Sequence, residues 1–139
     1  PATSYVEAFV KDVNRARALT VENVMKPPVG RITATTIGEA LKQMKKFSND
    51  YGYVVTDEGY QGIILQETLE QEAKSNSLGE IEQEFMEEVP SISPDSVLEE
   101  IIPETLSADY PLPVVGKEGD LQGQLARSSL AEVLGSERK

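Results

Sequence analysis

The pattern of apolar and polar residues along the chain predicts two copies of one unit, 60 positions apart. Residues 29–33 recur as residues 89–93, and residues 36–39 recur as residues 96–99. Each four-residue run resembles a capping box, in which a hydroxyl group accepts a bond from the first helical turn and a glutamate reaches back. Apolar residues at helical spacing follow the first box, at Ile37, Ala40, Leu41 and Met44. We therefore expect a helix after each box, and Pro103 should make the second helix short or kinked.

Two extended apolar runs follow each of these helices. Residues 51–55 and 60–65 flank Asp57-Glu58-Gly59, and residues 112–115 and 121–125 flank Lys117-Glu118-Gly119-Asp120. Acidic residues and glycine between apolar runs are typical of tight turns, so each pair predicts a β-hairpin. Each hairpin leads into another predicted helix, over residues 66–74 in the first copy and over residues 128–134 in the second, where Leu130, Val133 and Leu134 form the apolar stripe.

Each copy also opens with a short capped helix, near residues 20–25 and near residues 77–86, the latter through a capping box of Ser77 and Glu80. The predicted order of elements within one copy is therefore α-β-α-β-β-α. Another helix, starting at Ser4, precedes the first copy and carries an apolar stripe of Tyr5, Phe9, Val10 and Val13. The chain thus divides into a helical segment 1–19, a first repeat 20–76, a second repeat 77–136 and a tail 137–139.

Composition narrows the chemistry. The 139 residues contain neither cysteine nor histidine, which removes imidazole bases, thiol nucleophiles and the usual zinc ligands. The net charge of −11 argues against nucleic acid as a partner. We expect no catalytic residue and no metal site. No apolar run is long enough to span a membrane and no signal peptide is evident, so we expect a soluble fragment.

The excess negative charge is concentrated in one part of the chain. Residues 67–104 contain 12 acidic residues and one lysine, whereas the rest of the chain has 12 acidic and 12 basic residues. Two interpretations remain open, a solvated helical face or an electrostatic sensor of ionic strength.

Several of these features together resemble the CBS-domain family. They are Val24-Met25-Lys26, the strand at Ile32-Thr33, the helix from Ile37, the paired strands, and Gly62-Ile63-Ile64 before the last helix of the repeat. The resemblance implies an α/β (α+β) fold, a tandem CBS-domain pair of two β-α-β-β-α repeats with pseudo-two-fold symmetry. Residues 20–76 and 77–136 would be the two CBS domains. Proteins of this family often bind adenine nucleotides in a cleft between the repeats.

Residues 1–15 are similar to the stretch that joins the ATPase and CBS domains in glycine betaine/L-proline transport ATP-binding proteins. This resemblance implies that residues 1–19 are a connector from an ATPase domain outside the chain, in line with the absence of a P-loop pattern. The intact protein would then be the energising subunit of an osmolyte importer. Its implied partners are a second copy of the chain, the ATPase domain of the same polypeptide and, indirectly, a permease. The implied location is the cytoplasmic side of the inner membrane.

The family's nucleotide motif places a hydroxyl residue and an aspartate after a glycine, and both repeats depart from it. The aspartate position holds Thr68 in the first repeat and Ser129 in the second. Because one hydroxyl replaces a bidentate acceptor, the resemblance does not establish tight binding of AMP or ATP, and cyclic di-AMP would depend less on that aspartate. The cofactor remains unknown. The candidate ligand-binding residues are Thr33, Tyr53, Thr68, Ser93, Arg127 and Ser129.

Each candidate residue also has a structural interpretation. Thr33 and Tyr53 would be packed strand residues, and Arg127 would be a surface cation near a helix start. Two functions therefore remain open. The chain is either a regulatory module that binds an adenine nucleotide or a cyclic dinucleotide in the inter-repeat cleft or the dimer seam, or a ligand-free dimerisation module that responds to ionic strength through its acidic segment. An enzyme is the least favoured class.

Overall fold

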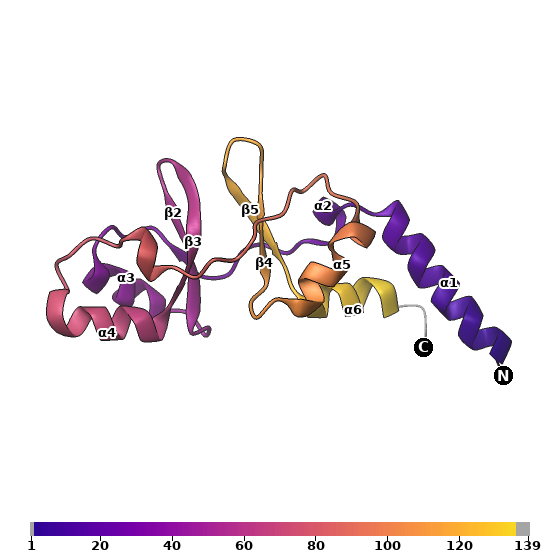
Figure 1. Ribbon diagram of the computed structural model, residues 1–139, viewed down its shortest axis with the longest axis horizontal. Coiled ribbons are helices and arrows are strands. Elements are labelled where there is room, and N and C mark those ends of the chain that lie inside the picture. Colours follow the sequence, from indigo (N-terminus) through magenta and orange to yellow (C-terminus); the bar gives the residue numbers. More distant parts are fainter. Residues whose placement is uncertain (1, 136–139) are drawn as a thin grey trace. The chain divides into compact units, whose positions relative to one another are not determined.

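The computed structural model describes residues 2–135, but the side chains of residues 2–6, 8, 9 and 12 lie outside that description. Figure 1 shows the helices and strands of the chain. They are α1 (Ala2–Ala18), α2 (Val21–Val24), β1 (Arg31–Ile32), α3 (Ile37–Met44), β2 (Tyr51–Thr56), β3 (Gly59–Leu65), α4 (Gln66–Asn76), the 3₁₀ turn η1 (Gln83–Phe85), α5 (Leu98–Ser107), β4 (Leu112–Val115), β5 (Leu121–Leu125) and α6 (Arg127–Gly135). The predicted tail, residues 137–139, lies outside the described residues.

The chain forms two compact units that are not contiguous in sequence. Among the described residues, unit 1 contains 2–27, 91–116 and 122–135, and unit 2 contains 28–90 and 117–121. The sequence predicts a boundary between the two repeats at residues 76 and 77, and this boundary stays a prediction. Each compact unit combines segments from both predicted repeats.

Unit 2 is built on a three-stranded sheet in the order β1-β2-β3. Strand β1 runs parallel to β2, and β2 pairs antiparallel with β3 in the predicted hairpin. Helices α3 and α4 pack against each other beside this sheet (Figure 1). Their apolar faces and one face of the sheet form a core of Ile32, Ile37, Ala40, Met44, Val54, Ile64 and Leu69. Helical and strand periodicity in the sequence thus places these residues in a shared buried cluster.

The two predicted capping boxes of unit 2 have different outcomes. Thr36 caps α3 as predicted, because its Oγ1 accepts a hydrogen bond from the Glu39 N–H at 3.3 Å. The helix predicted over residues 77–86 from Ser77 and Glu80 is wrong, since only the turn η1 forms there. Ser77 instead ends α4, and the carbonyls of Ser77 and Gly79 accept from the first backbone N–H groups of α3. This segment therefore caps another helix instead of starting its own.

Residues 117–121, which comprise the turn between β4 and β5 and the first residue of β5, belong to unit 2. The Tyr60 N–H donates to the Gly119 carbonyl at 2.9 Å, and Arg31 Nη2 donates to the Leu121 carbonyl at 3.0 Å. Gly59 has a φ of 104° and lies so close to Gly119 that a Cβ atom at residue 59 would overlap the Gly119 carbonyl oxygen. Glycine is required at residue 59 for both reasons.

Unit 1 contains the β4-β5 pair and helices α1, α2, α5 and α6. The first strand predicted for the second repeat is reduced to a single parallel bridge between Ile92 and Val114. Helix α5 is not short, because it continues through Pro103 to Ser107. Pro103 is exposed, so the carbonyl that loses its helical N–H partner lies on the solvated side of the helix. The N-cap of α5 is Val97, one residue later than the predicted Ser96, and its side chain makes no capping hydrogen bond.

Helix α1 packs against α5 and α6. Of its predicted apolar stripe, the side chains of Tyr5 and Phe9 lie outside the described residues, and Val10 is 47% exposed. The described residue that α1 buries fully is Ala16, near its end. No helix among residues 2–135 is both long enough and apolar enough to cross a membrane.

Candidate functional site

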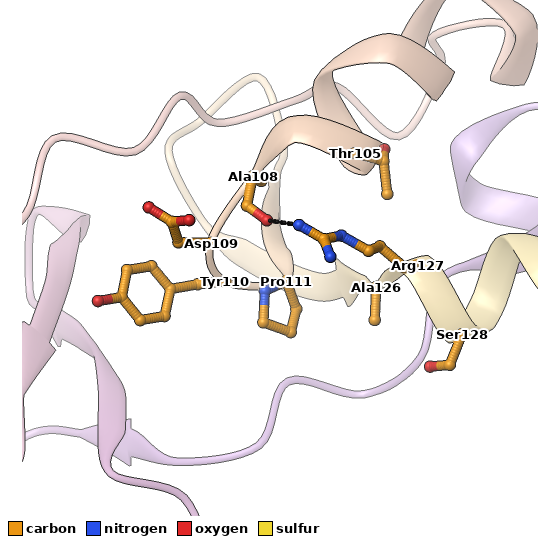
Figure 2. A pocket seen from close by; sticks show the side chains of 8 residues that line it. All are labelled: Thr105, Ala108, Asp109, Tyr110, Pro111, Ala126, Arg127 and Ser128. Atoms are coloured by element: carbon orange, nitrogen blue, oxygen red, sulfur yellow. Dashed lines mark hydrogen bonds between the residues drawn. The ribbon is translucent and has the colours of Figure 1, made fainter.

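A cavity of about 490 Å³ lies in unit 1, where α5 ends and α6 begins (Figure 2). We call it the α5–α6 cavity, and it is lined by Thr105, Ala108, Asp109, Tyr110, Pro111, Ala126, Arg127 and Ser128. Its volume falls within the range of about 300–1,000 Å³ that is usual for small-molecule sites. Size and position therefore make it the candidate site of this unit.

Arg127 is the basic side chain of this lining. It is the first residue of α6, and its Nη2 donates to the Ala108 carbonyl at 2.8 Å, as Figure 2 shows. A guanidinium group has five N–H donors in a planar fork, so this single bond leaves donors that suit a phosphate group. The N-terminal end of α6 adds a partial positive charge beside it. The arrangement is suited to an anionic group.

Two cavity residues were not identified from the sequence. Asp109 and Tyr110 come from the segment that joins α5 to β4. The Asp109 carboxylate is a bidentate acceptor of the kind that the nucleotide motif lacks at Ser129, and the Tyr110 ring offers a surface for a planar base. The sequence signal that pointed to them was weak, because it consists only of their position just before the strand that starts at Leu112.

Of the six predicted ligand residues, Arg127 alone lines this cavity. Ser129 is buried within α6, where its exposed fraction is 3%, and the neighbouring Ser128 lines the cavity in its place. Ser93 is also in unit 1, but its exposed hydroxyl accepts from the Asp95 N–H at 3.2 Å in the turn before α5.

The other three predicted residues belong to unit 2. The hydroxyl of Thr33 accepts from Gln43 at 2.8 Å, and the Thr33 N–H donates to the same side chain at 2.9 Å. Thr68 is half-buried in α4. Tyr53 is fully buried in β2, 6.2 Å from the ring of Tyr51, and burial raises its pKa well above the usual range. These contacts describe packing roles, and ligand roles for the six residues remain predictions.

A second cavity, of about 620 Å³, lies within unit 2 near the turn between β2 and β3. Its lining is Ala34, Thr35, Val54, Thr56, Asp57, Glu58, Gln61, Glu80, Ile81, Gln83 and Met86. This lining includes three carboxylates and no basic side chain, so Coulomb repulsion makes it a poor site for an anionic ligand. Among residues 2–135, no group of three or more acidic side chains is placed to hold a metal ion.

The chain resembles known proteins in both sequence and fold. The model of the CBS domain family matches residues 21–71. The glycine betaine/carnitine transport ATP-binding protein GbuA of Listeria monocytogenes serotype 1/2a (strain 10403S) is 30% identical over 140 residues, which cover 99% of this chain and 35% of that protein. The chain thus spans about a third of the length of this curated relative.

Solved structures of similar fold agree with this match. A crystal structure of CbpB in complex with c-di-AMP has a TM-score of 0.75 at 18% identity and covers 91% of each chain. Staphylococcus aureus OpuCA has a TM-score of 0.66 at 22% identity, over 83% of this chain and 98% of that chain. These likenesses confirm the predicted α+β fold of a CBS pair. The chain thus has the fold of a tandem CBS pair, matches the CBS domain family over residues 21–71, and is homologous to a glycine betaine/carnitine transport ATP-binding protein.

Proposed function

We propose that this CBS pair regulates an osmolyte importer for glycine betaine or proline by binding an adenine nucleotide or a cyclic dinucleotide in the α5–α6 cavity. The observation that carries the proposal is the placement of Arg127, at the start of α6, in a cavity of about 490 Å³ that also presents Asp109 and Tyr110. Phosphate, ribose and base each have a chemically suitable neighbour there. The relative bound to c-di-AMP supports the choice of ligand class.

The same proposal assigns the remaining parts of the chain. Residues 1–19 would connect to an ATPase domain of the same polypeptide, and the CBS pair would act as a homodimer that reaches the permease indirectly. The intact protein would lie on the cytoplasmic face of the inner membrane. Its homology to a transport ATP-binding protein supports these assignments.

Titration calorimetry with AMP, ATP and cyclic di-AMP tests the binding step. An Arg127→Gln variant should lose about tenfold or more in affinity, since a hydrogen bond to a charged group is worth about 1.5–3 kcal/mol. Arg31→Gln is the matched control, because Arg31 is also an exposed arginine that donates to a backbone carbonyl, in unit 2. An absence of heat with all three ligands at millimolar concentration would refute the proposal, and equal losses in both variants would refute the site.

Asp109 separates the two ligand classes. AMP and ATP carry a vicinal ribose diol that a carboxylate can hold at two points, whereas each 3′-linked ribose of cyclic di-AMP has one hydroxyl group. Asp109→Asn should therefore weaken AMP and ATP several-fold. Cyclic di-AMP should bind as well as before or better, because a negative charge near its phosphates is removed. The reverse order of effects would show that Asp109 does not hold a ribose.

A second function is favoured by the exposure of the acidic segment. Of its 12 acidic residues, all but Glu72 are exposed. One of the exposed residues, Glu99, forms an ion pair with Arg17. Such a surface is sensitive to screening, whose length is about 8 Å at physiological salt. In this alternative the chain dimerises without a ligand and responds to ionic strength. Light scattering over a salt series tests it, and a monomer at every salt concentration would exclude it.

A further inference from the structure

Three arginine side chains link helices α1, α5 and α6 of unit 1 in a closed ring. Arg15 Nη1 of α1 donates to the carbonyl of Val133 in α6 at 2.6 Å. Arg17 Nε of α1 lies 2.8 Å from Glu99 Oε2 in α5. Arg127 closes the ring, because it joins the start of α6 to the Ala108 carbonyl at the end of α5.

Arg15 and Arg17 of α1 bind α6 and α5 at the ends of these helices that lie away from the cavity. Glu99 is in the first turn of α5, and the cavity residue Thr105 is near its last. Arg127 begins α6 at the cavity, and Val133 is in its last turn. Since a helix rises about 1.5 Å per residue, each helix extends roughly 9 Å between its cavity residue and its contact with α1. Both helices thus connect the cavity to α1.

The two contacts of α1 differ in strength. Arg15 is partly buried, and it donates to the carbonyl of Val133 in the last turn of α6, at the negative end of the helix dipole. The Arg17–Glu99 pair has side chains that are 65% and 44% exposed, so solvent screens it and it contributes little alone. Arg15 is therefore the main positioning residue.

We propose that α1 reports whether the α5–α6 cavity is occupied, with Arg127 as the link between the two. The inference rests on the proposed ligand-binding function. An anionic ligand that binds the remaining donors of Arg127 pulls its guanidinium group toward the cavity, so the bound and free states differ in the bond to Ala108 that holds α5 to α6. Such a difference between states is what a ligand needs in order to shift a conformational equilibrium. Through Arg15 and Arg17, the shift changes how firmly α1 is held.

A first experiment tests the link without any ligand, by amide hydrogen exchange of the whole chain. Arg127→Gln should speed exchange in α1 several-fold and leave the β4-β5 amides of the same unit unchanged. Arg31→Gln, which removes a similar bond in unit 2, should not alter exchange in α1. Equal exchange of α1 in both variants would overturn the inference, and so would a uniform acceleration over unit 1, because that would indicate simple destabilisation.

A second experiment adds cyclic di-AMP or AMP to the parent chain and to an Arg15→Gln/Arg17→Gln double variant. Ligand should change the exchange rate of α1 in the parent and not in the double variant. The double variant should still bind, with affinity altered by roughly fivefold, because coupling between two sites is reciprocal. Binding to the parent without a response in α1 would overturn the link and leave the proposed function standing. An absence of binding would refute the proposed function, and the ligand-free comparison would then decide the link.

Discussion

The contact between Gly59 and Gly119 allows a sharp test of the structure of unit 2. Both glycines have positive φ, 104° and 87°, so alanine at either position costs about 1–2 kcal/mol in backbone strain. They differ in the space around them. An added Cβ at Gly119 would lie 3.6 Å from its nearest atom, the Glu58 carbonyl oxygen, which is an ordinary contact. The same atom at Gly59 would overlap the Gly119 carbonyl oxygen.

Gly59→Ala should therefore be clearly more destabilising than Gly119→Ala. Forced overlap costs about 1–3 kcal/mol, and loss of the bond from the Tyr60 N–H to the Gly119 carbonyl costs about 0.5–1.5 kcal/mol more. The expected difference between the two variants is thus about 1.5–4.5 kcal/mol. It is large against a typical stability of about 5–15 kcal/mol.

Urea unfolding followed by circular dichroism measures this difference as the change in midpoint multiplied by the slope of the free energy of unfolding. Each variant serves as the control for the other, because both carry the same substitution at positive φ. If the two variants agree within about 0.5 kcal/mol, the turn at residues 117–121 does not contact Gly59 as described, since the added clash alone should cost about 1 kcal/mol or more.

Three further predictions use the same assay. Thr36→Ala should lower the free energy of unfolding by about 1 kcal/mol through loss of the α3 cap, whereas Ser96→Ala should be nearly neutral because the N-cap of α5 is Val97. Equal losses of stability in the two variants would contradict these N-cap positions. Tyr60→Phe should stabilise the chain by about 1 kcal/mol, since among the described residues the buried hydroxyl of Tyr60 has no hydrogen-bond partner, and a loss of stability would show that it has one. Burial raises the pKa of Tyr53 and Tyr60 above 10.0, so the unfolded chain ionises first. The free energy of unfolding should therefore keep its full value below about pH 10 and fall above it, by at most about 1.4 kcal/mol per pH unit for each tyrosine. Tyr60→Phe should reduce this slope. An unchanged slope would argue against the burial of the Tyr60 hydroxyl.

The sequence predicts the parts of this fold whose causes are local. The apolar spacing of Ile37, Ala40 and Met44 and the cap at Thr36 each act within a few residues, and α3 forms where they indicate. The same reasoning fails at Ser77, because its carbonyl satisfies the N-terminus of a helix about 40 residues earlier, and a capping-box pattern carries no information about that competition. The hydrogen bond from the Gly38 N–H to the Ser77 carbonyl forms only when the chain is folded.

The candidate site was predictable only in part, for the same reason. Arg127 stands out in the sequence because it lies at the start of a predicted helix beside the glycine motif. Asp109 and Tyr110 lie in a connecting segment without periodicity, and their relation to Arg127 depends on how α5 ends against α6. The sequence therefore identified the cation of the cavity, Arg127, and missed the hydrogen-bond acceptor Asp109 and the aromatic ring of Tyr110.

Ligand binding and sensitivity to ionic strength are compatible in this module, because α5 carries the charges relevant to both. Its end lines the cavity, while Glu99, Glu100 and Glu104 are exposed along its length. At low salt these carboxylates oppose the approach of an anionic ligand to Arg127. Salt screens that long-range repulsion more effectively than it weakens a direct contact between a guanidinium group and a phosphate. Ionic strength would therefore set how readily the cavity fills, and the acidic segment would tune a ligand sensor instead of replacing one.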